Sequence, residues 1–344
     1  MKKKTQPNDI GVLGAGSWGT AIAYVLASNG FNIHLWAFEK ETVEEINTKH
    51  TNLKYISTDK LPENIIATNN PKDLSECDII INVVPTQFIR SVFDNIGFDL
   101  RRKYIINCSK GIEISTSKRI SQIFTEDFGV SSKNYAILVG PSHAEEVLKN
   151  MPTTVVVCSE SRVLRRAVQE IFGNDRFRVY ESNDVVGAEL GSSMKNVIAI
   201  AAGIIDGLGL GDNSAAALVT RGLAEMVRFG RTQGAKRITF SGLSGLGDLY
   251  VTCSSKHSRN RKLGVAIGKG QDVTAMPDSQ KMVVEGYPTA KAIYNLAKKS
   301  NVEVPLIEKV YQVLYEGLEP TTAIKELMNR DQVKEWWSKN KKNK

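Results

Sequence analysis

Near its start the chain reads Gly11-Val12-Leu13-Gly14-Ala15-Gly16-Ser17-Trp18-Gly19-Thr20-Ala21, which contains the pattern G-x-G-x-x-G. A short apolar run typical of a strand precedes the pattern, and helical sequence follows it. In such a turn Gly14 lets the chain leave the strand sharply, Gly16 leaves room for a pyrophosphate, and Gly19 lets helix and strand pack closely. The free N–H groups at the start of the helix attract phosphate. The stretch therefore predicts a dinucleotide-binding turn.

The residues after this turn support the same interpretation. A second apolar run covers residues 32–37, and an acid, Glu39, stands twenty residues after Gly19. Strand, glycine turn, helix, strand and acid in this order form the fingerprint of dinucleotide binding. Two roles stay open for Glu39: a contact to the ribose, or an acid in the first turn of the next helix, where the helix dipole favours it.

Short apolar runs alternate with helical stretches from residue 10 to about residue 140, which is typical of a parallel sheet with helices on both faces. From about residue 184 the strand signals stop and helical patterns dominate. We therefore expect an α/β fold, in which a Rossmann-like domain with a mostly parallel sheet is followed by an all-helical C-terminal domain. The expected strands are residues 10–13, 32–36, 65–67, 79–83, 104–108, 135–139, 153–158 and 177–180.

A length of 344 residues suits two domains. We expect the Rossmann-like domain over residues 9–186 and the helical substrate and catalytic domain over residues 187–337. Basic tails are expected over residues 1–8, which we predict to be disordered, and 338–344. Three amphipathic stretches near the end, residues 289–298, 306–315 and 321–328, are expected to be scaffold helices.

The charge distribution argues against a nucleic-acid partner. The formal net charge is +8, but the two tails hold enough lysines to leave the body of the chain close to neutral, and charged termini are usually solvated. We found no run of about twenty apolar residues, so we expect no membrane span. The cysteines are expected to be free thiols in a reducing cytoplasm, with no metal site: Cys77, Cys108, Cys158 and Cys253.

One lysine stands in an apolar helix. Residues 187–202 are small or apolar nearly all round, which predicts a buried helix, yet Lys195 and Asn196 lie in the middle of it. A buried lysine loses its proton readily or needs a partner, so Lys195 is a candidate acid or base. The alternative is a lysine whose head group reaches the surface.

Polar loops follow several of the expected strands. Residues 85–86, 109–111 and 140–142 should line one crevice, because ligands bind beyond the carboxyl ends of parallel strands. Lys110 stands directly after a strand and is expected in this crevice, although a surface lysine is the alternative.

Two further polar clusters lie in the helical half. Glycines 242, 245 and 247 indicate a tight backbone rather than a helix core, and Asp248 beside them can hold a lysine ammonium. The guanidinium of Arg259 suits a phosphate or a carboxylate. The alternative for residues 258–261 is an exposed helix start with a serine cap.

Together these stretches resemble the bacterial-type family of NAD(P)-dependent glycerol-3-phosphate dehydrogenases, from about residue 10 to about residue 330. The segments that carry the resemblance are residues 14–21, Ser109-Lys110-Gly111, Gly140-Pro141-Ser142, Lys195-Asn196-Val197, residues 216–222, residues 245–249 and Ser258-Arg259-Asn260-Arg261.

The resemblance implies that hydride passes between NAD(H) or NADP(H) and C2 of dihydroxyacetone phosphate, giving sn-glycerol 3-phosphate for phospholipid synthesis. It implies that Lys195 is the proton donor and that Asp248 and Thr252 orient it. The substrate site then comprises Lys110, Gly140, Ser142, Lys195, Asn196, Asp248, Thr252, Ser258, Arg259 and Asn260. The cofactor site comprises Gly14, Gly16, Ser17, Trp18, Gly19, Tyr55, Lys110, Ala144, Arg259, Val283 and Glu285. A homodimer is the candidate assembly.

The chain departs from the family pattern at two positions. Relatives usually carry Phe where this chain has His143, a change expected to affect packing only. Many have Arg or His where this chain has Phe38, which offers no charge to a 2′-phosphate. Glu39 would repel that phosphate and Lys40 can compensate, so we expect both cofactors to be used without a strong preference for NADPH.

Two other functions remain as alternatives. A related two-domain dehydrogenase of the 3-hydroxyacid type shares the first domain and often a helix lysine, but the cluster at residues 258–261 favours a phosphorylated substrate. A nucleotide-binding regulator without catalysis needs no acid or base, so Lys195 and Asp248 argue against it.

Overall fold

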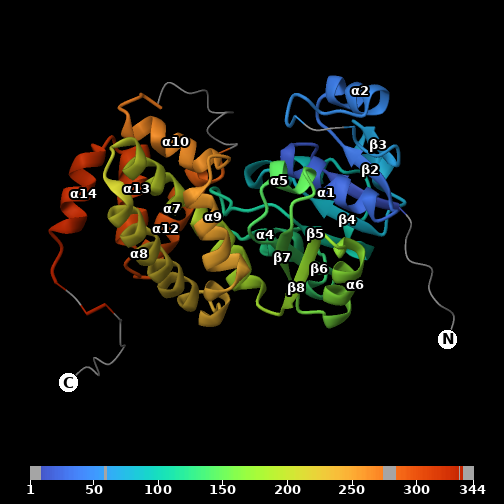
Figure 1. The fold of residues 1–344 in the computed structure, drawn as a ribbon. Coiled ribbons are helices and arrows are strands. Elements are labelled where there is room, and N and C mark those ends of the chain that lie inside the picture. The colour runs from blue at the N-terminus through green and yellow to red at the C-terminus, as the bar shows by residue number, and fades with distance from the viewer. Residues whose placement is uncertain (1–8, 58–59, 274–283, 333, 336–344) are drawn as a thin grey trace.

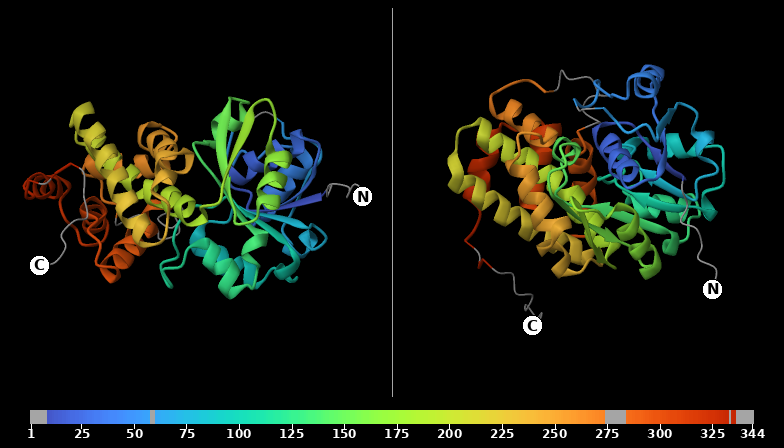
Figure 2. Two further views of the ribbon diagram at one scale, coloured as in Figure 1. Left: turned by 90° about the horizontal axis from the view of Figure 1, so that it is seen from below. Right: turned by 45° about the vertical axis from the view of Figure 1, so that its right-hand side comes forward.

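The computed structural model describes residues 9–57, 60–273, 284–332 and 334–335. Two lobes lie side by side, one built around a sheet and the other from helices (Figures 1 and 2). The chain completes the sheet before it enters the helical lobe, so the order of the two parts follows the change of pattern in the sequence. The expected fold class is confirmed, and the exact domain bounds stay a prediction.

The sheet contains the eight strands that the sequence predicts, in the order β3-β2-β1-β4-β5-β6-β7-β8. Neighbouring strands are parallel except β6 and β7, which are antiparallel. The observed ends differ from the expected ones by at most two residues. The strands are β1 (Asp9–Leu13), β2 (Asn32–Trp36), β3 (Ile65–Thr68), β4 (Ile79–Asn82), β5 (Tyr104–Asn107), β6 (Tyr135–Val139), β7 (Thr153–Cys158) and β8 (Phe177–Ser182).

The strand order reverses between β1 and β4. From β1 the chain adds β2 and β3 on one side and then returns to add β4 on the other. Leu13 is opposite Asn82, and Asn82 is opposite Asn107, so the carboxyl ends of β1, β4 and β5 share one edge. In open α/β sheets ligands bind at such a switch point.

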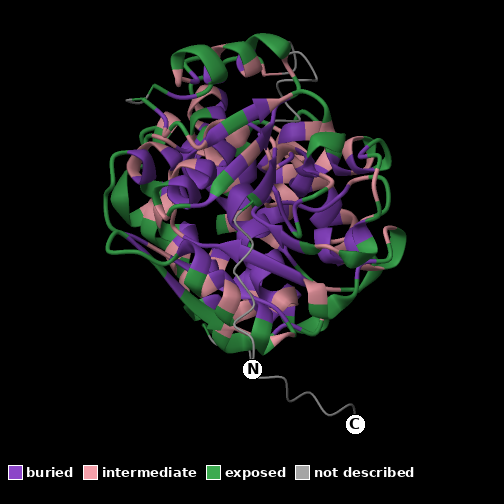
Figure 3. Ribbon diagram, turned by 90° about the vertical axis from the view of Figure 1, so that its right-hand side faces the viewer, coloured by how far each residue is buried: buried purple, intermediate pink, exposed green. Residues whose placement is uncertain are grey.

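Helices cover both faces of the sheet. Each face has its own hydrophobic core, and the two cores are largely separate. In one core, side chains of β1 and β2 pack against α1, α5 and α6. In the other, side chains of β4, β5 and β6 pack against α3 and α4. Figure 3 shows the buried strands enclosed by helices whose outer surfaces are exposed. The helices of this lobe are α1 (Ser17–Ser28), α2 (Lys40–Lys49), α3 (Ile89–Asp94), α4 (Ile120–Gln122), α5 (Ala144–Leu148) and α6 (Arg162–Phe172).

The helical lobe is organised around α7 (Val185–Gly207), which packs against α8, α9, α10, α12 and α13 (Figure 1). A Cβ atom on Gly203 would lie 2.1 Å from the carbonyl oxygen of Arg261, and one on Gly264 would lie 2.0 Å from that of Ile200. Only glycine therefore allows α7 and α10 to approach so closely. The other helices are α8 (Gly211–Thr232), α9 (Asp248–Ser254), α10 (Arg259–Gly268), α12 (Gly286–Lys299), α13 (Pro305–Tyr315) and α14 (Pro320–Met328).

Of the described helices, α7 alone is long and apolar enough to cross a membrane by length and composition. However, 94% of its most apolar window is buried inside the protein. Packing in the helical lobe therefore accounts for the apolar character of this helix.

A buried carboxylate joins the two lobes near the start of α7. Glu189 accepts hydrogen bonds from the backbone N–H of Ser121 (2.7 Å), from the hydroxyl of Tyr135 (3.0 Å) and from the guanidinium of Arg119 (2.7 Å). Because these donors belong to the sheet lobe, the first turns of α7 are held in a defined position relative to the strands.

The glycines near residue 245 form a different backbone from the expected one. Residues Leu243–Gly247 make a π-helical turn that runs directly into α9, so the segment is helical and wider than an α-helix. A Cβ on Gly245 would lie 2.1 Å from the carbonyl oxygen of Phe240, which explains the need for glycine there. This turn sets the direction in which α9 begins with Asp248.

Candidate functional site

The glycine turn has the geometry that the fingerprint requires. Gly14 has a φ of +112°, and a Cβ there would lie 2.9 Å from the carbonyl oxygen of Val83 at the end of β4. A Cβ on Gly19 would lie 1.7 Å from the carbonyl oxygen of Gly14, so only glycine fits. A Cβ on Gly16 would meet nothing within 4 Å, which leaves open space before the first turn of α1. Each of the three positions thus favours glycine for a different structural reason, as the sequence predicts.

Several buried polar atoms near this edge have no hydrogen-bond partner among the residues that the structure describes. They include Nε1 of Trp18 in α1 and Oε2 of Glu285, the residue before α12. The other carboxylate oxygen of Glu285 accepts a hydrogen bond from the backbone N–H of Thr86 (3.1 Å). Orphaned buried polar atoms are rare in native proteins and call for a ligand or water. Together with the open space at Gly16, they fit a dinucleotide.

Burial raises the pKa of Glu285 to about 7, against the opposing effects of the Thr86 N–H and the charge of Arg259. The absence of a side chain at Gly111 makes room for this carboxylate at the edge of the sheet, because a Cβ on Gly111 would lie 2.7 Å from Oε2 of Glu285. Ala144, another expected cofactor residue, is buried as the first residue of α5. Val283 lies outside the described residues.

A small polar cluster lies where β2 ends. The hydroxyl of Ser17 donates to the backbone oxygen of Tyr55 (2.7 Å), and the hydroxyl of Tyr55 donates to Oε1 of Glu39 (2.5 Å). Glu39 directly precedes α2, so it stands at a helix start as one of the two sequence interpretations proposed. Its carboxylate also accepts a hydrogen bond from Lys54 (3.0 Å), which no motif had indicated.

The centre of the candidate active site is Lys195, which is buried in α7. Its ammonium donates hydrogen bonds to Oδ1 of Asp248 (2.8 Å) and to Oγ1 of Thr252 (2.7 Å). Asp248 and Thr252 lie one turn apart on α9, so both face α7. Lys195 therefore does not extend to the surface, and the alternative interpretation of this residue is wrong.

Lys110 completes the cluster from the sheet lobe. Its ammonium donates to Oδ2 of Asp248 (2.8 Å) and to the backbone oxygen of Gly140 (3.3 Å). The hydroxyl of Ser142 also donates to that oxygen (3.2 Å). Lys110 follows β5 and Gly140 follows β6, as expected for residues at the carboxyl edge of the sheet. One carboxylate thus bridges two ammonium groups, one from each lobe.

The electrostatics of this cluster favour a titratable lysine. Burial lowers the pKa of Lys195 to about 8, and the positive charge of Lys110 acts in the same direction, while Asp248 opposes both. Burial alone would raise the pKa of Asp248, but the two lysines lower it below its usual value. Asp248 therefore stays ionised while Lys195 can gain or lose a proton near neutral pH.

A second hydrogen-bonded set lies beside the first. The side-chain amide of Asn260 donates to Oδ1 of Asn196 (3.1 Å), and its oxygen accepts from the backbone N–H of Gly286 (2.8 Å). The hydroxyl of Ser258 caps α10 by accepting from the backbone N–H of Arg261 (3.2 Å). Ser258 and Asn260 are buried, whereas Arg259 between them is exposed. The serine cap of the alternative interpretation is therefore present, at a helix start that is only partly exposed.

His143, one of the two departures from the family pattern, packs beside His257, with ring centroids 5.9 Å apart. Burial lowers the pKa of His143, and the charges of Lys195 and Lys110 lower it further. This imidazole therefore lies near the lysine pair and favours its neutral form.

Two residues of the site, Asn52 and Lys54, were missed in the sequence. The amide of buried Asn52 donates to the backbone oxygen of Ala15 (2.8 Å) and to Oγ1 of Thr20 (2.8 Å), which fixes the glycine turn. Both residues lie in a loop after α2 without a recognisable motif. Their only signal is their position next to Tyr55.

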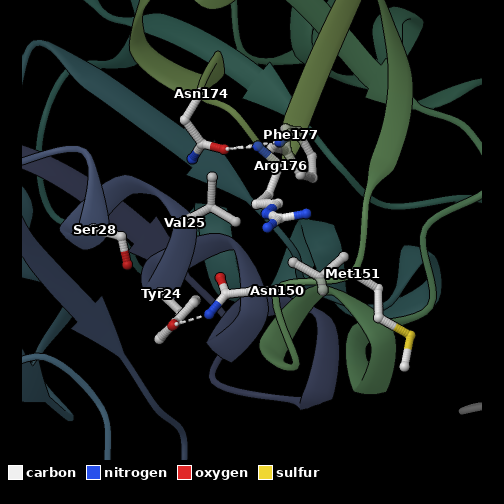
Figure 4. Close-up of a pocket in the computed structure, with 9 residues that line it drawn as sticks. Tyr24, Val25, Ser28, Asn150, Met151, Asn174, Arg176 and Phe177 are labelled. Atoms are coloured by element: carbon white, nitrogen blue, oxygen red, sulfur yellow. Dashed lines mark hydrogen bonds between the residues drawn. The ribbon is translucent and has the colours of Figure 1, made fainter.

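A separate hollow lies away from the lysine cluster, between α1 and the turns that precede β7 and β8 (Figure 4). The amide of Asn150 donates to the hydroxyl of Tyr24 (2.9 Å), and Oδ1 of Asn174 accepts from the backbone N–H groups of Arg176 and Phe177. These polar groups already hydrogen-bond to one another or to the backbone beside them, so they are not left open to a ligand. We therefore place the candidate site at the lysine cluster.

Comparisons with known proteins agree with this geometry. The family model described as NAD-dependent glycerol-3-phosphate dehydrogenase N-terminus matches residues 9–164, and the corresponding C-terminus model matches residues 184–325. The chain is 47% identical to the glycerol-3-phosphate dehydrogenase [NAD(P)+] of Geobacillus kaustophilus over 330 residues, which cover 95% of this chain and 96% of the relative. It is also 47% identical to that of Enterococcus faecalis over 334 residues, covering 96% and 97%.

Among solved structures, the crystal structure of glycerol-3-phosphate dehydrogenase from Coxiella burnetii superposes with a TM-score of 0.86 at 37% identity, over 94% of this chain and 99% of that one. The sequence matches and the superposition extend over both lobes. This chain belongs to the NAD-dependent glycerol-3-phosphate dehydrogenase family.

Proposed function

We propose that this chain reduces dihydroxyacetone phosphate to sn-glycerol 3-phosphate with NADH or NADPH. The observation that carries the proposal is the buried ammonium of Lys195, held by Asp248 and Thr252 and joined through the same carboxylate to Lys110. Ketone reduction needs one proton donor beside the carbonyl oxygen, and a lysine with a pKa near neutrality suits that role.

The cofactor would be held at the carboxyl edge of the sheet, where its nicotinamide supplies the hydride. The N–H groups at the start of α1, the open side of Gly16 and the indole of Trp18 would bind it from the sheet lobe. Glu285 would approach from the helical lobe. The remaining expected contacts come from Ser17, Gly14, Gly19, Tyr55, Lys110, Ala144 and Arg259.

In this proposal Lys195 gives its proton to the C2 oxygen as negative charge develops there, or removes it in the reverse reaction. Asp248 and Thr252 hold the ammonium in position, and Lys110 adds a second positive charge beside the same oxygen. Asn196, tied to Asn260, would donate a neutral hydrogen bond to the substrate. Gly140, Ser142 and Ser258 complete the proposed substrate site.

The phosphate would be bound at the start of α10. The exposed guanidinium of Arg259 offers two parallel donors to a phosphate, which a lysine ammonium cannot reproduce. Arg259→Lys should therefore lower kcat/KM for dihydroxyacetone phosphate by at least about tenfold, in line with the loss of one charge-assisted hydrogen bond. The measurement is the initial rate with dihydroxyacetone phosphate and with unphosphorylated dihydroxyacetone.

Arg261→Lys is the matched control for this prediction, because its guanidinium pairs with Asp206 of α7 at 2.9 Å. It should affect the two substrates equally and weakly. If Arg259→Lys also reduced both substrates equally, Arg259 would serve the cofactor or the fold, and the phosphate assignment would be wrong.

The pKa of Lys195 also predicts the pH dependence. The reduction requires the protonated lysine, so its kcat/KM should be constant below pH 8 and fall above about 8. The oxidation of glycerol 3-phosphate requires the neutral lysine, so its kcat/KM should rise through the same pH. Both profiles should be measured above the pKa of the substrate phosphate. Profiles that change in the same direction would contradict the role of Lys195.

The decisive test of the whole proposal is a substrate panel. Purified protein should oxidise NADH or NADPH with dihydroxyacetone phosphate and much more slowly with 3-oxo acids. Preferential turnover of a 3-oxo acid would instead support the 3-hydroxyacid type of dehydrogenase. A role in phospholipid synthesis, a cytoplasmic location and a homodimeric assembly accompany the proposal as expectations.

A further inference from the structure

The cluster at the end of β2 contains an ion pair that the proposed reaction does not use. Lys54 lies 3.0 Å from Oε1 of Glu39, and the hydroxyl of Tyr55 donates to the same oxygen at 2.5 Å. The side chain of Lys54 is 54% exposed and that of Glu39 is 26% exposed. One carboxylate oxygen therefore receives two donors, and one of these donors carries a charge and reaches solvent.

The position of this cluster relates it to the cofactor. In dinucleotide-binding folds the acid after the second strand contacts the 2′-hydroxyl of the ribose, and a nearby basic residue accommodates a 2′-phosphate. The hydroxyl of Ser17, in the first turn of α1, donates to the backbone oxygen of Tyr55 (2.7 Å). The loop that carries Lys54 and Tyr55 is thus fixed to the helix that would bind the pyrophosphate.

Among the described residues at the end of β2, Phe38 carries no charge and Lys40 forms no ion pair with Glu39. The side chain of Phe38 is 81% exposed and lies edge-on to Trp36, with ring centroids 6.5 Å apart. Lys40 is exposed as the first residue of α2. Lys54, by contrast, is already paired with Glu39, the acid that would contact the ribose.

We propose that Lys54 is a specificity-determining residue that lets one site accept both cofactors. With a 2′-hydroxyl bound, Lys54 stays on Glu39 and neutralises it, while the carboxylate accepts a hydrogen bond from the hydroxyl. With a 2′-phosphate bound, the ammonium leaves Glu39 and pairs with the phosphate. This inference rests on the cofactor class of the proposed function and goes beyond it by naming the discriminating residue.

Energetics allow such an exchange. An ion pair that is partly open to solvent contributes little to stability, so releasing Lys54 costs little. A phosphate dianion offers the ammonium more charge than a carboxylate does. Tyr55 can keep donating to Glu39 after Lys54 has left, which limits the cost of exposing that carboxylate beside the phosphate.

The test measures equilibrium binding, independently of turnover. Dissociation constants should be obtained by calorimetry for NADH, NADPH, adenosine 5′-monophosphate and adenosine 2′,5′-bisphosphate, with the full chain and its variants. We expect Lys54→Gln to raise the ratio of the Kd for NADPH to that for NADH by about tenfold or more. The two adenosine nucleotides should show the same change, and Lys54→Arg should restore most of the original ratio.

Two lysines of the neighbouring helix α2, Lys49 and Lys40, provide controls. Lys49→Gln removes an exposed charge from the last turn of α2 and should leave the ratio within about twofold of the original. Lys40→Gln tests whether Lys40, rather than Lys54, is the lysine that pairs with the 2′-phosphate. If it changed the ratio as strongly as Lys54→Gln, or if Lys54→Gln weakened both cofactors equally, the inference would be overturned.

Glu39→Gln should have the opposite effect to Lys54→Gln. Removing the acid frees Lys54 and removes repulsion, so the ratio should fall, in favour of NADPH. A protein that binds both cofactors with these ratios but does not turn over dihydroxyacetone phosphate would refute the proposed function and leave this inference intact. A protein that binds neither nucleotide would refute both.

Discussion

Lys195→Met is expected to lower kcat for dihydroxyacetone phosphate by at least about a hundredfold, the effect typical of a lost general acid. Methionine is an unbranched side chain close in length to the aliphatic part of lysine, and it is compatible with a helix that is buried along most of its length. The fold and the cofactor affinity should therefore change little. The variant removes the only atom of residue 195 that hydrogen-bonds to Asp248 and Thr252 in the described structure.

The measurements are kcat, the melting temperature and the Kd for the cofactor, in parallel for the variant and for Lys262→Met. Lys262 is an exposed lysine on α10, so its replacement removes the same charge without touching the site. Near-normal turnover of Lys195→Met would disprove the assignment. A large loss of cofactor affinity would indicate that Lys195 serves binding rather than proton transfer.

Asp248→Asn should lower kcat to an extent similar to Lys195→Met, but for a different reason. Asp248 is buried and is the carboxylate that both Lys110 and Lys195 contact. Removing its charge leaves two ammonium groups close together in a buried place, which typically costs roughly 3–5 kcal/mol of stability. Without the carboxylate the pKa of Lys195 should fall below about 8, because Asp248 is the main group that raises it.

The pH profile distinguishes this explanation from simple loss of structure. In Asp248→Asn the fall in kcat/KM for the reduction should begin at lower pH than in the original protein. In Lys110→Met it should begin at higher pH, because the charge of Lys110 lowers the pKa of Lys195. Opposite shifts require that all three groups act on one proton. Equal profiles in the two variants would show that Lys195 does not titrate in the reaction.

Local sequence determined the sheet lobe almost completely. Eight apolar runs of strand length became the eight strands, because the period and length of such runs are properties of neighbouring residues. The roles of Gly14, Gly16 and Gly19 followed for a similar reason, since each glycine answers a local steric demand. Lys195 was recognisable as unusual because its charge contradicts the apolar helix around it.

The tertiary structure decided which residues meet. Lys110 and Lys195 are brought to one carboxylate only by the packing of α7 against α9 and by the donors that hold Glu189 at the sheet. The sequence indicated a pKa shift for Lys195, but neither the size of that shift nor the ion pair between Lys54 and Glu39 could be predicted from it. Burial and charge proximity depend on distances between segments far apart in sequence, whereas a motif records only the spacing of neighbours.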